Sequence, residues 1–201
     1  MKVAVTGGVG SGKSVVCRIF SECGFFAIST DELARDAVRP GTSAYRKVIK
    51  KFGKSVMLEN KALNRKKLRE IITEDTGAKR KLEEILHPEI LRIMNRRISE
   101  KLKTGKSVVV EIPLLFELNL ENQFDFVVTV CSRKETRIGR LTARDGISRE
   151  AAQKLIRIQM PEEEKAKRSH FVIRNDGSID RLEKDTRIVC KRILAEECFD
   201  E

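Results

Sequence analysis

The chain has 201 residues, of which 40% are hydrophobic, and 41 Lys and Arg against 30 Asp and Glu give it a formal net charge of +11. This length suffices for one substantial hydrophobic core and argues against two large independent domains. No apolar run approaches the roughly 20 residues that a membrane-spanning helix needs, and a glycine-rich motif stands where a cleavable leader would lie, so we expect neither. Five cysteines without a Cys-x-x-Cys pair favour free thiols, a reducing cytoplasm and no structural zinc.

Short apolar runs alternate with longer amphipathic stretches, which indicates an α/β fold with a mainly parallel five-stranded sheet. Strands are expected at residues 2–6, 25–29, 107–111, 126–130 and 170–174. Helices are expected at residues 13–23, 32–38, 43–52, 64–72, 75–86, 88–104, 134–145, 148–160 and 179–197. The pair His87-Pro88 predicts a helix boundary, because proline suits a first helical turn.

The order of these elements, together with the phosphate-binding pattern G-x-x-x-x-G-K-S at residues 7–14, predicts three functional parts. Residues 1–30, 105–131 and 170–201 form a nucleotide-binding core, and residues 31–104 form a helical acceptor-binding region. Residues 132–169 form a second helical, charged excursion that we expect to act as a lid over the bound nucleotide.

Residues 7–14 read Gly-Gly-Val-Gly-Ser-Gly-Lys-Ser, between an apolar strand and a helix, and match the phosphate-binding loop pattern G-x-x-x-x-G-K-S. Glycines allow successive N–H groups to point at a phosphate, and the helix that follows adds its positive end. Lys13 would reach the β- and γ-phosphates, and Ser14 would offer a hydroxyl to Mg²⁺. The motif predicts that the protein binds a nucleoside triphosphate.

Two carboxylates follow expected strands. Asp31 lies after the second strand, where ligands bind in open α/β sheets. Ser29 and Glu32 fit a helix capping box, which leaves Asp31 as either the acceptor of a substrate hydroxyl's proton, the interpretation we favour, or a first-turn helix charge. Glu111 ends the third strand, where phosphate-loop enzymes often place a carboxylate that faces Mg²⁺.

Four arginines recur at helical spacing in the second excursion: Arg133, Arg137, Arg140 and Arg144. Such a like-charge stripe is unfavourable by itself, so we expect it to face an anion, although a plain basic surface remains the alternative. Further on, Glu162-Glu163-Glu164 followed by basic residues fits a surface helix whose charges match its dipole. The overall positive charge fits nucleic-acid binding, a polyphosphate-collecting site or a solvated charged surface.

The chain resembles the dephospho-coenzyme A kinase family almost end to end. The resemblance is carried by Thr6 with the phosphate loop, Asp31 with Ala34-Arg35, Pro40-Gly41-Thr42, Asn64-Arg65, Leu86-His87-Pro88, Pro113-Leu114-Leu115-Phe116-Glu117, Arg140 with Arg144, Gln159 and Val172-Ile173-Arg174-Asn175-Asp176-Gly177. It implies a phosphate-loop kinase that transfers the γ-phosphoryl group of ATP, with Mg²⁺, to the ribose 3′-hydroxyl of dephospho-coenzyme A.

The resemblance also implies roles for individual residues. Catalysis falls on Lys13, Asp31 and Arg140. ATP would be bound by Gly8, Val9, Gly10, Ser11, Gly12, Lys13, Ser14, Val15, Arg144, Asn175 and Gly177. The acceptor would be bound by Thr6, Asp31, Arg65, His87, Leu115 and Glu117, and Mg²⁺ by Ser14 and Glu111.

The chain departs from the family pattern at three positions. Ser29 stands where relatives commonly have a first Asp of Asp-x-Asp, Val15 where Thr is usual, and Asn64 where Asp is frequent. A nucleoside or nucleoside-monophosphate kinase is the alternative enzyme, and a basic ATP-dependent nucleic-acid-binding protein is a more remote one. We expect small-molecule partners only, with no nucleic acid and no membrane, and we favour a monomer.

Overall fold

The computed structural model describes residues 1–197, and Cys198 lies outside them. Five strands form one sheet in the order β2-β3-β1-β4-β5. They are β1 (Lys2–Gly7), β2 (Phe26–Ser29), β3 (Val108–Glu111), β4 (Phe126–Cys131) and β5 (Phe171–Arg174). The pairs β1–β3, β1–β4 and β4–β5 are parallel, so the predicted α/β class is confirmed.

The helices are α1 (Lys13–Glu22), α2 (Thr30–Ala37), α3 (Ser43–Phe52), α4 (Arg65–Glu74), α5 (Thr76–Leu102), α6 (Lys134–Asp145), α7 (Arg149–Arg157), α8 (Glu162–Lys167) and α9 (Ile179–Glu197). Among residues 1–197, none is both long enough and apolar enough to cross a bilayer.

Two compact units divide the chain. The sheet unit comprises Met1–Ile28 and Lys101–Glu201, and the helical unit comprises Ser29–Glu100. Residues 132–169 belong to the sheet unit in this division, and their action as a lid stays a prediction.

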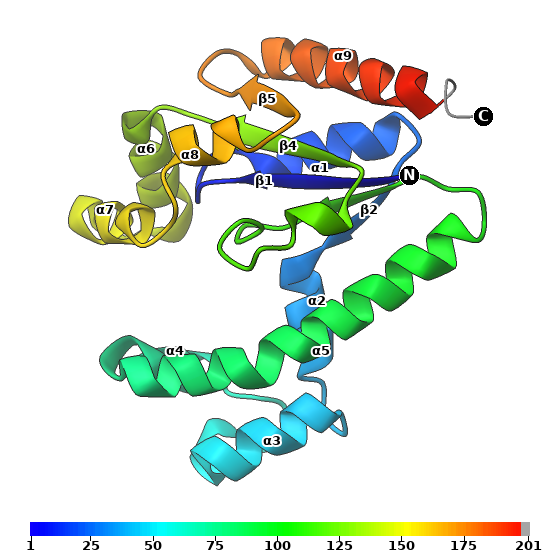
Figure 1. The fold of residues 1–201 in the computed structure, drawn as a ribbon. Coiled ribbons are helices and arrows are strands. Elements are labelled where there is room, and N and C mark those ends of the chain that lie inside the picture. Colours follow the sequence, from blue (N-terminus) through cyan, green and yellow to red (C-terminus); the bar gives the residue numbers. More distant parts are fainter. Residues whose placement is uncertain (198–201) are drawn as a thin grey trace. The chain divides into compact units, whose positions relative to one another are not determined.

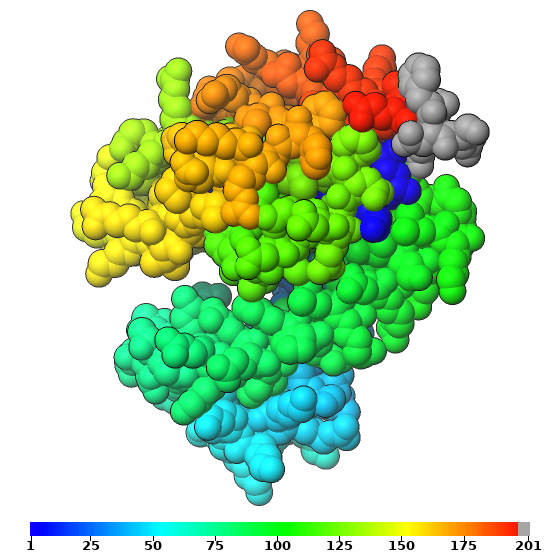
Figure 2. Space-filling view, viewed as in Figure 1, coloured from blue at the N-terminus to red at the C-terminus, as the bar shows by residue number. Residues whose placement is uncertain are grey.

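The core of the sheet unit lies between the sheet and the helices α1 and α9, which pack side by side (Figure 1). Val3, Val128 and Val130 of the strands meet Phe20 of α1 and Ile193 of α9, and all five are buried. The strands are apolar on successive residues because helices cover both faces of a parallel sheet. On the opposite face, α8 packs against β4 and β1, and Figure 2 shows the atoms of α7 and α8, yellow to orange, on the surface of this unit.

The helical unit has an apolar core of its own. Val48 of α3, Val56, Leu63, Leu68 of α4 and Leu82 of α5 form one buried cluster. Thr42 caps α3 by accepting from the N–H of Tyr45, and Asn64 caps α4 by accepting from that of Lys67. Side-chain caps of this kind supply acceptors for the otherwise unpaired N–H groups of a first turn.

The predicted break at His87-Pro88 is wrong, because α5 continues through Pro88 for 27 residues. Proline inside a helix removes one backbone hydrogen bond, which normally ends or bends the helix. Here Leu82 precedes Pro88, and Ile93 and Met94 follow it, and all three are buried. Apolar burial on both sides therefore outweighs the lost hydrogen bond.

The predicted capping box at Ser29 is also wrong. Ser29 is the N-cap residue of α2, but within the described residues its side chain accepts no cap hydrogen bond. The first turn of α2 instead contains the carboxylates of Asp31 and Glu32, which the helix dipole favours at that end.

Candidate active site

The phosphate loop joins β1 to α1 and has the backbone that its glycines predict. Gly7, Gly10 and Gly12 have φ angles of 145°, 77° and 97°. Side chains rarely tolerate such positive angles, so these positions favour glycine. Lys13 is 7% exposed, and its Nζ atom lies 3.0 Å from the carbonyl oxygen of Gly8. The ammonium group is thus held against the loop that would surround a phosphate.

Ser14 and Glu111, the two residues expected at Mg²⁺, come together in the structure. The Ser14 hydroxyl donates to Oε1 of Glu111 over 3.0 Å, because β1 and β3 are adjacent and their carboxyl ends meet. A hydroxyl and a carboxylate are the hard oxygen ligands that Mg²⁺ prefers. Within the described part of the chain, no group of three or more His, Cys, Asp or Glu side chains is arranged to hold a metal.

Arg140 of α6 ties the phosphate loop to the segment after β5. Its guanidinium donates to the carbonyl oxygens of Gly10 and Ser11 over 3.3 and 3.4 Å, and to the carbonyl oxygen of Asn175 over 3.0 Å. The Asn175 amide donates in turn to the Ser11 carbonyl over 2.8 Å. The arginine and the amide thus hold the same loop carbonyl.

A cavity of about 270 Å³ lies beside these contacts. It is lined by Gly12, Val15, Arg140, Asn175, Gly177, Ile179 and Leu182. Four of the residues expected to contact ATP, namely Gly12, Val15, Asn175 and Gly177, share this cavity with the catalytic candidate Arg140. Its apolar wall and its position next to the helix start suit a flat heterocyclic base.

The arginine stripe does not face a ligand as a unit. Arg137 is 6% exposed, and its Nη1 atom forms an ion pair of 3.1 Å with Oε1 of Glu162. Burial lowers the pKa of Arg137, and the charge of Glu162 opposes that effect. Arg144 forms a bidentate pair with Asp145, at 2.7 and 2.8 Å. The prediction of an anion opposite the whole stripe is therefore wrong for Arg137, whose anion is a protein carboxylate.

Three residues from 159–165 form contacts that the sequence did not predict. Oε1 of Glu162 accepts from the N–H of Gly8 over 3.2 Å, and Oε1 of Gln159 accepts from that of Val9 over 2.7 Å. Lys165 is fully buried. The expected surface helix is thus partly an interior one, and only the resemblance had drawn attention to Gln159.

Gly8 is glycine for a reason of space. A Cβ atom at this position would overlap the guanidinium of Arg137, whose Nε donates to the carbonyl of Val9 over 2.9 Å. Because Arg137 is also paired with Glu162, its guanidinium has little freedom to move aside. The absence of a side chain at Gly8 therefore leaves the space that the guanidinium of Arg137 occupies against the loop.

The segment after β3 contains the acceptor candidates of the sheet unit. The hydroxyl of Thr6 donates to the carbonyl of Pro113 over 3.5 Å, and the side chain of Leu115 is fully buried. Glu117 pairs with Lys165 at 2.8 Å and also accepts from the N–H of Met160 over 3.1 Å. The Glu117 carboxylate is thus fixed by residues from the region between α7 and β5.

The other three candidates belong to the helical unit. Asp31 is in the first turn of α2, Arg65 is the first residue of α4, and His87 lies in the middle of α5. Arg65 and Asp31 are exposed, and His87 is half-buried. Their roles toward an acceptor are proposals.

Comparison with known proteins identifies relatives along nearly the whole chain. A family model described as dephospho-CoA kinase matches residues 1–181. The dephospho-CoA kinase of Geobacter sulfurreducens is 42% identical over 183 residues, which cover 90% of this chain and 93% of the relative. That of Carboxydothermus hydrogenoformans is 42% identical over 179 residues, covering 89% and 87%.

Solved structures show the same fold. The dephospho-CoA kinase from Campylobacter jejuni has a TM-score of 0.73 and 30% identity, and the alignment covers 96% of this chain and 98% of that one. A shikimate kinase from Acinetobacter baumannii has a TM-score of 0.55 with 16% identity, covering 97% and 93%, and supports the fold alone.

Proposed function

Since the chain belongs to the dephospho-CoA kinase family, we propose that it transfers the γ-phosphoryl group of ATP to the ribose 3′-hydroxyl of dephospho-coenzyme A. A bond forms between the 3′-oxygen and the γ-phosphorus while the bond from that phosphorus to the β,γ-bridging oxygen breaks. The products are coenzyme A and ADP. The observation that carries the proposal is the match of residues 1–181 to the family model. The phosphate loop with Lys13 and the contact between Ser14 and Glu111 support it.

Lys13 stabilises charge during transfer. The phosphoryl group passes through a loose transition state, so catalysis depends on positioning and electrostatics rather than on a strong base. An ammonium beside the β- and γ-oxygens stabilises the negative charge that moves to the leaving ADP. The buried position of Lys13 strengthens this interaction, because little water screens it.

Mg²⁺ would be held by the Ser14 hydroxyl and the Glu111 carboxylate and would neutralise the phosphate oxygens. Arg140 would contact the nucleotide from the wall of the cavity next to Asn175. Asp31 would orient the 3′-hydroxyl and accept its proton late in the transfer. In the sheet unit, Thr6, Leu115 and Glu117 would bind the acceptor. For the helical unit, the resemblance implies acceptor binding by Arg65 and His87.

The test is an acceptor panel with ATP in a coupled ADP assay. We expect turnover with dephospho-coenzyme A and none with nucleosides or nucleoside monophosphates at equal concentration. Turnover should stop when EDTA removes Mg²⁺, and Lys13→Ala should lose about 10²–10³-fold in kcat, the usual cost of one electrostatic group at a transition state. Preference for a nucleoside acceptor would refute the proposal.

We also propose a cytoplasmic monomer with small-molecule partners. The four cysteines that the structure describes are free thiols, which fits a reducing compartment. Light scattering coupled to gel filtration would give the mass. Titration with duplex and single-stranded DNA at two salt concentrations would expose phosphate contacts, which weaken steeply with salt.

A further inference from the structure

The short helix α8 carries two buried side chains of opposite charge. Glu162 and Lys165 stand three residues apart on one face, and they are 9% and 0% exposed. Each reaches a different loop of the sheet unit. An unpaired buried charge is costly in free energy, so each of these side chains needs a partner of opposite charge close to it.

Glu162 faces the phosphate loop. Its Oε1 atom accepts from the N–H of Gly8 and from the guanidinium of Arg137, over 3.2 and 3.1 Å. Its Oε2 atom accepts from the N–H of Ser132 over 2.9 Å. One carboxylate thus joins the phosphate loop, α6 and the end of β4. Without its charge, Arg137 would remain buried with no full counter-charge.

Lys165 faces the segment 113–117. Its ammonium donates to the carbonyl of Pro113 over 2.9 Å and forms an ion pair of 2.8 Å with Glu117. The carbonyl of Lys165 itself accepts from the hydroxyl of Ser169 over 2.8 Å. The side chain therefore holds both ends of this segment, while its own helix is anchored near β5.

We propose that Glu162 and Lys165 are positioning residues for the two substrates: Glu162 shapes the phosphate loop for ATP, and Lys165 shapes the segment 113–117 for the acceptor. The second half rests on the proposed function, in which Leu115 and Glu117 belong to the acceptor site. The proposal has a distinctive consequence. Two substitutions three residues apart on one short helix should raise the KM of different substrates.

The experiment measures both KM values for Glu162→Gln and Lys165→Met. Glu162→Gln should raise the KM for ATP about 10-fold and leave that for dephospho-coenzyme A within about twofold, in line with the loss of one charged hydrogen bond. Lys165→Met should do the reverse. Direct binding of ADP, followed by calorimetry, should weaken about 10-fold in Glu162→Gln alone.

Matched controls are available on the same helix. Glu163→Gln and Lys167→Met make the same charge changes at exposed positions, and both KM values should stay at wild-type levels. If Lys165→Met fails to fold, as judged by circular dichroism and Tm, Lys165→Gln removes the same charge but keeps a hydrogen-bond donor for the Pro113 carbonyl. Restoration of the ATP KM toward wild type by Glu162→Asp would support a role for the charge.

The outcomes separate this proposal from the proposed function. If both KM values rise together in either variant, or neither changes, α8 is merely structural and the proposal is overturned. If the wild-type protein does not phosphorylate dephospho-coenzyme A, the proposed function fails, whereas ADP binding by Glu162→Gln still decides the role of Glu162.

Discussion

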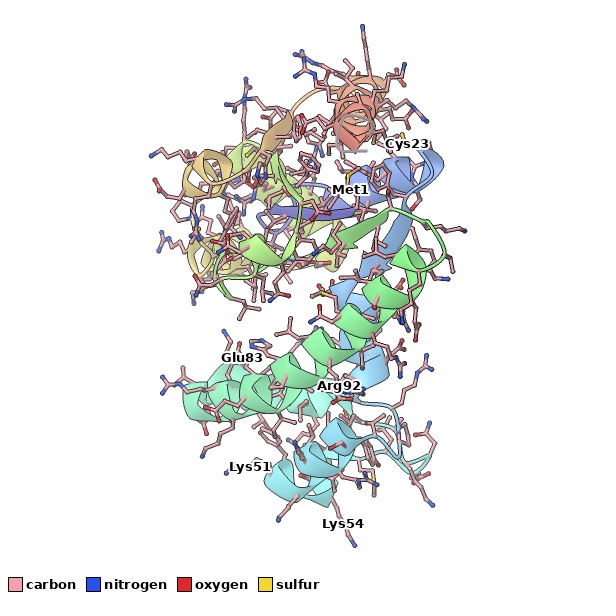
Figure 3. The ribbon with its side chains drawn as sticks, turned by 45° about the vertical axis from the view of Figure 1, so that its right-hand side comes forward. Met1, Cys23, Lys51, Lys54, Glu83 and Arg92 are labelled. Carbon is pink, nitrogen blue, oxygen red and sulfur yellow. The ribbon has the colours of Figure 1, made fainter. Side chains whose placement is uncertain are left out.

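The two long helical segments of this chain use their charges in opposite ways. In residues 132–169, Arg137, Glu162 and Lys165 point inward and hold backbone groups of the sheet unit. In the helical unit, pairs such as Lys67–Glu70 and Arg96–Glu100 each lie on one helix, and both partners are exposed. Figure 3 shows Lys51 and Lys54 pointing away from this unit, which is built around an apolar cluster instead.

The difference teaches that helical charge periodicity does not reveal burial. Both segments are strongly charged, and both fit surface helices when they are considered alone. Exposed pairs contribute little to stability, whereas loss of one partner from a buried pair is costly. The partner of a buried charge here comes from a distant loop, so only the tertiary fold distinguishes the two segments.

The largest effect should come from Asp31→Asn in the helical unit. General acid–base groups typically contribute about 10²–10⁴-fold, so kcat should fall within that range while the KM for ATP changes little. Steady-state kinetics with both substrates would measure this. Such a result would show that the helical unit contributes catalytic chemistry as well as an apolar scaffold.

Ser29→Ala is the control for Asp31→Asn. Because Ser29 forms no cap hydrogen bond among the described residues, this variant should keep both its stability and its activity. An active Asp31→Asn beside an inactive, stable Ser29→Ala would transfer the role of proton acceptor away from Asp31, with Glu111 the next candidate.

Leu82→Ala tests the apolar side of the comparison. Leu82 is 6% exposed in the cluster of the helical unit, and removing such a side chain typically costs about 2–5 kcal/mol of stability. At the neighbouring position the half-exposed Glu83 pairs with Lys79, and Glu83→Ala should change stability by less than about 0.5 kcal/mol. Urea denaturation would compare them. Equal losses would mean that surface ion pairs matter as much as the core does.

Arg140→Ala tests the inward charges of the sheet unit. If repulsion within the arginine stripe were the only effect, removing the Arg140 charge would make the protein more stable. In the structure, however, Arg140 donates hydrogen bonds to three carbonyl groups. We therefore expect a loss of about 1–3 kcal/mol together with a lower kcat/KM for ATP. An unchanged or higher Tm would show that these contacts add nothing.

The smallest effect should come from Asp176→Asn. Burial raises the pKa of Asp176, but hydrogen bonds from the Arg133 N–H and the Ser132 hydroxyl and the nearby arginine charges outweigh it, so the pKa is lowered. A lowered folded-state pKa stabilises the protein above the unfolded value of about 3.9 and loses that effect as the pH falls further. The gap in Tm between wild type and variant should narrow below about pH 4. A gap that widens in acid would contradict this.

Local rules predicted much of the fold. Helices at 43–52, 134–145 and 179–197 have the expected bounds, and the phosphate loop lies between β1 and α1. Two of the failures have one physical origin, because they depend on contacts that are distant in sequence. Packing on both sides carried α5 through Pro88, and the fold around Gly8 and Ser132 buried Glu162.

For the candidate active site, the sequence likewise indicated individual residues but not the contacts between distant parts of the chain. Motif spacing indicated Ser14 and Glu111 separately, and the adjacency of β1 and β3 explains their contact. No spacing could have paired Lys165 with Glu117, since the two residues are 48 positions apart and β4, α6 and α7 lie between them.

The close approach of Arg137 to Gly8 has a consequence for how this sequence can change over time. A side chain at Gly8 is tolerated only after Arg137 has become smaller, and a smaller residue at 137 leaves Glu162 without its ion pair. Substitutions at these positions are therefore linked: a change at either 137 or 162 alone leaves a buried charge without its counter-charge, so the two must change together before position 8 becomes free to vary. Three sites from separate parts of the chain thus form one mutational unit.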